Sequence, residues 1–238
     1  MNSSCDSYDE FTRTSSSVRS PSEMTSETSK QVLRPVVRGK FIFVGDEKLL
    51  VRGVTYGTFR PDADGNQFPQ RATVERDFVL MAANGINSVR TYTVPPRWLL
   101  DLAQKHGLYV MVGLPWEQHI SFLSSSKTVR SIEERLREGV RSCAGHPAVL
   151  CYSIGNEIPA PIVRWHGRRR VEHFLEKLYD AAKEEDPKGL VTYVNYPSTE
   201  YIRLPFVDIF ASTFIWNRSP FSRAILPACK TWQATGRC

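Results

Sequence analysis

Asn156 and Glu157 end an apolar run, AVLCYSIGNE, and Ile158 and Pro159 follow them. A run of this kind is typical of a buried strand, so the carboxylate would lie at a strand end and not on a solvated helix. A side chain held there can act as a general acid or base. A structural glutamate that pairs with an arginine or a helix N-terminus fits the same residue types equally well. The run therefore indicates acid–base chemistry as one of two interpretations.

Further polar and aromatic residues follow the ends of other apolar runs. They are Tyr56, Arg60, Arg90, Tyr92, the segment from Trp116 to His119, Asn195 and Tyr196. In a closed α/β barrel, the loops after the carboxyl ends of the strands carry the chemistry. We therefore expect these residues to lie on the same face as Glu157.

Short apolar strands that alternate with helices would position these residues. A hairpin around the turn Gly45-Asp46-Glu47 comes first, and the predicted strands are 51–57, 86–93, 108–116, 148–157, 190–197 and 206–210. The predicted helices are 73–84, 96–106, 131–143 and 171–185, and glycines follow the first two. Continuous apolar runs are typical of strands that helices cover on both faces, as in a parallel sheet.

Two α/β architectures fit this alternation: an open doubly wound sheet and a (β/α)₈ barrel. A dinucleotide-binding sheet would need a glycine-rich loop after its first strand, and the sequence has none there. Polar residues at several strand ends favour the barrel. We predict an incomplete (β/α)₈ TIM barrel with about six strands.

The composition is that of a soluble globular protein, with 41% hydrophobic and 24% charged residues among 238. The longest apolar runs fall far short of the roughly 20 residues that cross a bilayer, so we expect no membrane association. Five cysteines without a CxxC pair predict neither a disulfide framework nor a metal site, and we expect no cofactor. Such cysteine usage fits the cytoplasm.

The formal net charge of +6 comes partly from a cluster formed by Arg164 and residues 168–170. A solvated helix face explains the cluster better than a nucleic-acid surface, because no RNA-binding signature accompanies it. A basic protein that binds polyanions stays as an alternative function. Residues 1–34 are rich in serine and threonine and predict a disordered leader before the barrel.

The segment HPAVLCYSIGNE, residues 146–157, resembles the fourth-strand signature of retaining glycoside hydrolases with a (β/α)₈ barrel, especially glycoside hydrolase family two. The resemblance extends through VRGVTYG, MAANGINSVRTYTVPPRWLLDLAQKHGLYVMVGLPWE and PFVDI, and so covers the domain 35–209. The sequence is similar to bacterial glycosidase-like barrels that occur fused to a glycosyltransferase. The resemblance implies an oligosaccharide or polysaccharide substrate, β-linked glycosyl units and a double-displacement mechanism. It leaves the oligomeric state open.

The same resemblance implies a role for each matching residue. Glu157 would be the acid/base, Asn156 would bind the hydroxyl next to the anomeric carbon, and Arg90 would orient the nucleophile. Trp116 would be either an aromatic platform for a sugar ring or a core residue. For five weaker candidates, contacts with sugar hydroxyls and structural roles are equally good interpretations. These candidates are Glu117, His119, Tyr56, Asn195 and Tyr196. Trp165 and His166 follow the fourth strand, where a histidine is more often structural.

A retaining glycosidase needs a second carboxylate about 5 to 5.5 Å from the first. The family carries it at the end of strand seven, and residues 211–238 are too few for two more strand–helix repeats of roughly 30 residues each. Residues 210–238 lack family resemblance, and allowed codons in one shifted reading frame spell family-like sequence there. We therefore expect a barrel truncated before strand seven, an off-frame tail at 210–238 and no catalytic turnover.

Besides polyanion binding, two alternatives remain for the function. A carbohydrate-binding module would keep Trp116, Arg90 and Asn156 without catalysis. A transglycosylase that modifies glucans would share the covalent intermediate of the hydrolases and differ in the acceptor, in an intact parent protein.

Overall fold

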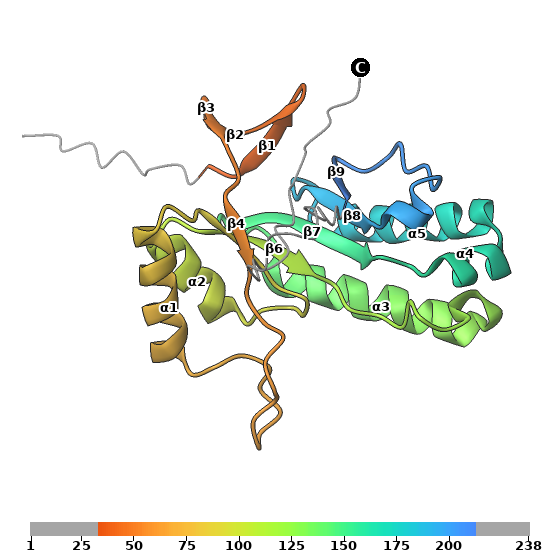
Figure 1. Ribbon diagram of the computed structural model, residues 1–238, viewed down its shortest axis with the longest axis horizontal. Coiled ribbons are helices and arrows are strands. Elements are labelled where there is room, and N and C mark those ends of the chain that lie inside the picture. Colours follow the sequence, from red (N-terminus) through yellow and green to blue (C-terminus); the bar gives the residue numbers. More distant parts are fainter. Residues whose placement is uncertain (1–32, 213–238) are drawn as a thin grey trace, which may run out of the picture. The chain divides into compact units, whose positions relative to one another are not determined.

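The computed structural model describes residues 33–212 (Figure 1). It begins with a three-stranded antiparallel sheet of β1 (Pro35–Arg38), β2 (Phe41–Val44) and β3 (Glu47–Leu49). Gly45 turns the chain between β2 and β3 with a φ of 62°, a left-handed conformation that glycine adopts without a steric penalty. The predicted hairpin is confirmed, with β1 as an additional strand.

A second sheet contains six parallel strands in sequence order. They are β4 (Gly53–Thr55), β5 (Ser88–Arg90), β6 (Tyr109–Gly113), β7 (Val149–Asn156), β8 (Val191–Asn195) and β9 (Ile209–Ser212). Each strand pairs in parallel with the next one along the chain. The predicted six-stranded α/β fold is therefore confirmed. Within residues 33–212 the sheet has two edges, β4 and β9.

Five α-helices follow the strands: α1 (Arg71–Ala83), α2 (Arg97–Lys105), α3 (Ser126–Cys143), α4 (Ala160–His166) and α5 (Arg168–Glu185). The helix α3 begins five residues before the predicted start, because the Ser125 side chain accepts a hydrogen bond from the Thr128 N–H and caps the helix there. The sequence pattern does not predict α4. Gly167, with a φ of 83°, separates it from α5, so Arg164 and residues 168–170 lie on two helices.

The strand predicted at 206–210 is shifted, since β9 runs from Ile209 to Ser212. It therefore passes the boundary predicted after Ile209. Residues 1–32 and 213–238, which include nearly all of the predicted leader and most of the predicted off-frame tail, lie outside the described residues. Nothing in the described part tests either prediction.

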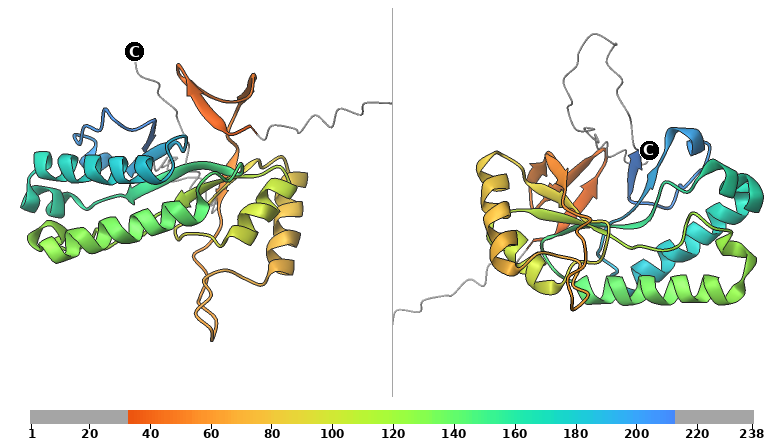
Figure 2. Two further views of the ribbon diagram at one scale, coloured as in Figure 1. Left: turned by 180° about the vertical axis from the view of Figure 1, so that it is seen from behind. Right: turned by 60° about the horizontal axis from the view of Figure 1, so that its bottom comes forward.

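The helices lie along the outer side of the curved sheet (Figure 2). The central strand β7 is buried from Val149 to Gly155, so both of its faces are covered, as its continuous apolar sequence predicts. On the outer face the sheet packs against helix residues such as Leu99 and Leu136. On the inner face Met111 and Val194 pack with Ile42 of the small sheet. This packing fixes the strand ends that carry the candidate site.

In the described part of the chain, no helix is long and apolar enough to cross a membrane.

Candidate active site

Glu157 follows the last residue of β7 and has a φ of 54°. Among residues 33–212 it is the one residue other than glycine with a positive φ. A left-handed conformation costs a glutamate about 1 kcal/mol or more, and it persists only where the surroundings impose it. Such strain is common at functional sites. The half-buried Glu157 therefore has a constrained backbone at the carboxyl edge of the sheet.

The turn donates hydrogen bonds to three residues that hold it in place. The Asn156 N–H donates to Oε1 of Gln118 at 2.8 Å, and the Glu157 N–H donates to the carbonyl of Val194 at 2.8 Å. The Ile158 N–H donates to the hydroxyl of Tyr193 at 3.0 Å. Three consecutive N–H groups are thus bonded to the loop after β6 and to β8, which explains how the strained residue is kept in place.

Arg90, at the end of β5, lies beside this turn. Its Nη2 donates a hydrogen bond to Oδ1 of Asn156, and its guanidinium carbon lies 4.7 Å from the ring centre of Tyr92. Arg90 is only 6% exposed. Burial lowers the pKa of Arg90, and the charge of Glu157 and the nearby Tyr92 act in the opposite direction. The structure thus brings together the three residues to which the resemblance assigns central roles.

Trp116 lies in the core. Its ring is 8% exposed and makes edge contacts with Phe122 and Phe174, at centroid distances of 4.8 and 5.6 Å. Its Nε1–H donates to the carbonyl of Ile154 at 2.8 Å. Of the two roles that the sequence left open for Trp116, these contacts match the core residue.

Tyr56 and Glu117 have partners elsewhere in the fold. The hydroxyl of the buried Tyr56 donates to Oδ2 of Asp77 on α1 at 2.9 Å, and burial raises the pKa of Tyr56. The exposed Glu117 pairs with Nη2 of Arg135 on α3 at 2.6 Å, and this hydrogen bond lowers the pKa of Glu117. Both side chains make contacts that support the sheet–helix packing.

Asn195 and Tyr196 end β8. The Asn195 side chain is buried and bonds to Thr199, both as donor to its carbonyl and as acceptor from its hydroxyl. Tyr196 is half-buried and donates its N–H to Oδ1 of Asn195 at 2.9 Å. Asn195 therefore shapes the loop after β8, whereas the Tyr196 ring stays a candidate for a substrate contact.

Of the remaining candidates, Trp165 and His166 lie on α4 and His119 lies in the loop after β6. Trp165 is 75% exposed, and His119 is exposed. His166 is buried, accepts a hydrogen bond at Nε2 from the Leu123 N–H at 3.4 Å and packs on Phe122. Burial lowers the pKa of His166. His166 thus has the structural role that the sequence predicts for it.

A match to a known family covers most of the chain: residues 36–235 match the family described as glycosyl hydrolases family 2, TIM barrel domain. The chain belongs to this family. The match continues past Ile209, where the sequence resemblance ends. Among the relatives of this family 2 barrel are a β-galactosidase of Vibrio cholerae, 30% identical over 154 residues, and β-galactosidase 2 of Enterobacter cloacae, 30% identical over 152 residues. The alignments cover 62% and 61% of this chain but only 14% and 13% of those proteins.

Solved β-glucuronidases share the fold. The family 2 barrel matches the enzyme of Bacteroides uniformis with a TM-score of 0.61 and 21% identity, over 74% of this chain and 22% of that one. It matches the apo enzyme of Ruminococcus gnavus with a TM-score of 0.60 and 15% identity, over 77% and 32%. At these identities the likeness shows the fold alone.

Gln118 and Tyr193 are the site residues to which the sequence analysis gave no role. Gln118 falls within the segment 116–119 after β6, but nothing in its type indicates a bond to the Asn156 backbone. In the sequence, Tyr193 lies in an apolar run and is typical of a core residue of a strand. Within the described part of the family 2 barrel, no group of three His, Cys, Asp or Glu residues is arranged to hold a metal ion.

Proposed function

We propose that Glu157 is the acid/base carboxylate of a site for β-glycosides in this family 2 barrel. The strained turn that carries Glu157, bonded to the loop after β6 and to β8, is the observation that supports the proposal. Asn156 would bind the hydroxyl next to the anomeric carbon. Arg90 would orient the partner carboxylate. Relatives named as β-galactosidases and β-glucuronidases suggest galactosides and glucuronides as first substrates to test.

In a double displacement, Glu157 would protonate the leaving oxygen and then take a proton from the incoming water or sugar hydroxyl. The nucleophile would be a second carboxylate about 5 to 5.5 Å away. Within the described residues, the carboxylate whose charge raises the pKa of Arg90 is Glu157 itself, the proposed acid/base and not a second carboxylate. We therefore propose that this chain by itself binds β-glycosides without turnover.

Binding and turnover of p-nitrophenyl β-galactoside and β-glucuronide test this function together. Calorimetric titration should detect binding of at least one of them to the purified chain, and Asn156→Ala should weaken it by about three- to tenfold, the share of one hydrogen bond. Asn84→Ala, at the exposed end of α1, is the matched control and should leave the affinity unchanged.

The outcomes separate the two parts of the proposal. Absence of binding to the wild-type chain would refute a glycoside site at Asn156 and Glu157. Release of nitrophenol that Glu157→Gln abolishes would support the acid/base role and refute the absence of turnover. Binding without release supports a glycoside site and the absence of turnover.

We also propose that the protein works in a reducing compartment, the cytoplasm. Cys143 and Cys151 are buried free thiols, and such thiols are typical of reducing surroundings. Fractionation of the source cells with an antibody against the chain tests this assignment, and recovery from an oxidising compartment would contradict it.

A further inference from the structure

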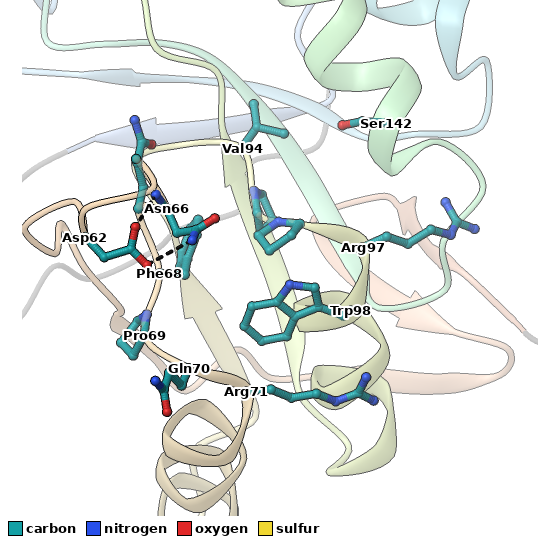
Figure 3. A pocket seen from close by; sticks show the side chains of 14 residues that line it. Asp62, Asn66, Phe68, Pro69, Gln70, Arg71, Val94, Arg97, Trp98 and Ser142 are labelled. Carbon is teal, nitrogen blue, oxygen red and sulfur yellow. Dashed lines mark hydrogen bonds between the residues drawn. The ribbon is translucent and has the colours of Figure 1, made fainter.

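Two surface pockets of the family 2 barrel differ in how their charges are arranged. The first, of about 760 Å³, is lined by Trp98 and lies between the loop that precedes α1 and the start of α2. Figure 3 shows that Arg71 and Arg97 lie apart in it and point away from the wall that contains Asp62. Oδ1 of Asp62 accepts a hydrogen bond from the Asn66 N–H of its own loop at 2.8 Å. Both signs of charge are present in this pocket, so it does not select one kind of charge.

The second pocket is a groove of about 610 Å³ between the N-terminal halves of α3 and α5. Its floor is apolar. Leu123 and Val129 line it, are half-buried and pack against the main hydrophobic core. The buried Phe174 closes it, and its ring lies on Phe122 at a centroid distance of 5.2 Å. Because the floor is continuous with the core, the groove is a preformed apolar surface.

Basic side chains lie on both sides of this floor. Arg130 is on the α3 side, and Arg170 and Lys177 are on the α5 side. His173 lies between them on α5, with Nδ1 at 3.6 Å from Oε2 of Glu176. No Asp or Glu is among the described residues that line the groove. In the described part of the chain, no ion pair or side-chain hydrogen bond engages Arg130, Arg170 or Lys177.

The same two helices are joined by ion pairs at their other ends. Arg137 of α3 pairs with Glu184 of α5 at 2.6 Å, and Arg141 of α3 pairs with Glu185 of α5 at 2.8 Å. There, each arginine on α3 has a carboxylate partner on α5. At the groove, both helices carry basic residues instead. A segment with carboxylates that lies in the groove would supply the partners that α5 lacks there.

The spacing of these cations matches a row of carboxylates better than a single anion. Arg170, Phe174 and Lys177 are at positions i, i+4 and i+7 and so lie along one face of α5. A helical rise of about 1.5 Å per residue separates Arg170 from Lys177 by about 10 Å along the axis. An amphipathic helix offers apolar side chains for the floor and several carboxylates beside them. Nucleic acid offers the negative charges without an apolar face.

We propose that the groove between α3 and α5 binds an acidic amphipathic helix of a partner protein. Its apolar side chains contact the floor, and its carboxylates pair with the basic residues on both sides. The first turns of α3 and α5 lie at the groove, and the positive ends of the two helix dipoles favour the same negative partner. The groove contains none of the residues proposed for glycoside binding, so docking there is independent of the Glu157 site.

A fluorescein-labelled peptide is the probe for a test on the purified whole chain. It has about 14 residues, with leucine at positions i, i+3, i+4 and i+7 and glutamate at most others. Fluorescence anisotropy should detect binding at micromolar concentrations. The same peptide with glutamine in place of each glutamate should bind at least about tenfold more weakly, because its charge pairs are lost. Alanine in place of each leucine should also weaken binding, because the floor contacts are lost.

Matched double variants test whether the basic residues of the groove act by position or by net charge. Arg130→Gln/Lys177→Gln removes one cation from each side of the groove and should weaken binding of the acidic peptide about fivefold or more. Lys188→Gln/Arg203→Gln removes the same charge from exposed positions outside the groove and should bind like the wild type. Thermal unfolding reports whether each variant folds.

Two substitutions of Val129 place side chains of equal size on the floor. Val129→Glu should abolish binding, because its carboxylate pairs with the cations of the groove and repels the peptide. Val129→Gln should weaken binding less, since it obstructs the floor without the charge. Equal binding by the two variants would contradict a role for the charges at the groove.

Four other results would overturn the proposal. They are no binding of the acidic peptide, equal binding of the glutamine peptide, equal losses in the two double variants, and displacement of the peptide by an equal concentration of oligothymidylate, which would mark a general polyanion surface. A dimer in size-exclusion chromatography that Val129→Glu dissociates would make a second copy of this chain the occupant and also overturn it. Selective loss in Arg130→Gln/Lys177→Gln, together with weak binding of the glutamine peptide, supports the docking groove.

Discussion

Two polar clusters at the six-stranded sheet each contain an arginine, a carboxylate and a side chain from β7, but their arginines have different partners. One lies where α5 ends before β8 and contains Arg34, Asp186 and Tyr152. The other lies at the carboxyl end of β7 and contains Arg90, Asn156 and Glu157. In the first cluster the arginine is paired with the carboxylate. In the second cluster the arginine is bonded to a neutral amide.

In the Arg34 cluster the two charged groups bond to each other. Nη1 and Nη2 of Arg34 donate to the two carboxylate oxygens of Asp186, each at 2.7 Å, and the Tyr152 hydroxyl and the Gly145 N–H also donate to it. Asp186 is 4% exposed. Burial acts to raise the pKa of Asp186, but the hydrogen bonds from Arg34 and Tyr152 outweigh it and hold the pKa below its usual value. Such a cluster stabilises the fold through bonds among its own members.

The Glu157 cluster costs stability where the Arg34 cluster adds it. Glu157 is held in a left-handed conformation, and Arg90 is buried beside an amide and not in a bidentate pair with a carboxylate. Similar residue types thus serve structure or chemistry according to their pairing. The comparison predicts opposite effects of substitution at the two ends of the sheet.

The largest effect is expected for Asp186→Ala, which leaves the half-buried Arg34 without its partner. Breaking a buried ion pair costs about 3 kcal/mol of unfolding free energy. Urea denaturation followed by circular dichroism measures the loss. Asp180→Ala, an exposed aspartate on the same helix, is the control and should change the stability little. A loss in Asp186→Ala no larger than the control would contradict the structural role of the cluster.

Tyr193→Phe should have the next largest effect. It removes the acceptor of the buried Ile158 N–H, and an unsatisfied buried donor costs about 1 to 2 kcal/mol. The variant should also weaken glycoside binding, because the turn that carries Glu157 loses one of its anchors. Denaturation and titration of the same sample measure the two effects. A stability loss with unchanged affinity would limit Tyr193 to the core.

Acid should weaken the Arg34 cluster in a defined pH range. The pKa of Asp186 lies below its unfolded value of about 3.9, so its stabilisation is complete above that pH and falls as the pH drops toward the folded pKa. The slope for one proton is at most about 1.4 kcal/mol per pH unit. Asp186→Asn should show a shallower dependence below pH 4 when both proteins are unfolded by urea. Parallel curves would refute the linkage.

Glu157→Gly tests the other end and should raise stability, the reverse of the effect at Asp186. Glycine adopts a φ of 54° freely, so about 1 kcal/mol of strain is relieved, in part offset by the greater chain entropy of glycine when unfolded. Glu157→Gln keeps the strain and should unfold like the wild type. If glycine destabilises the protein, the conformation of Glu157 is not strained and the contrast between the two clusters fails.

The sequence determined the parts of this protein that depend on local pattern. Apolar runs and glycines gave the six strands and four of the five helices, because burial on both strand faces and helix termination leave marks within a few residues. Parallel strands place their carboxyl ends at one edge, so the meeting of Arg90, Asn156 and Glu157 followed from their positions at strand ends.

Only the tertiary structure determined which partner each polar or aromatic side chain contacts. Trp116 is in the core because Phe122 and Phe174, distant in sequence, enclose it, and Glu117 is engaged because α3 presents Arg135. Gln118 in the loop after β6 and Tyr193 on β8 hold the Glu157 turn, and Trp98 lines a pocket together with a separate loop. Residue type limits what a side chain can bond, but long-range packing selects its partner.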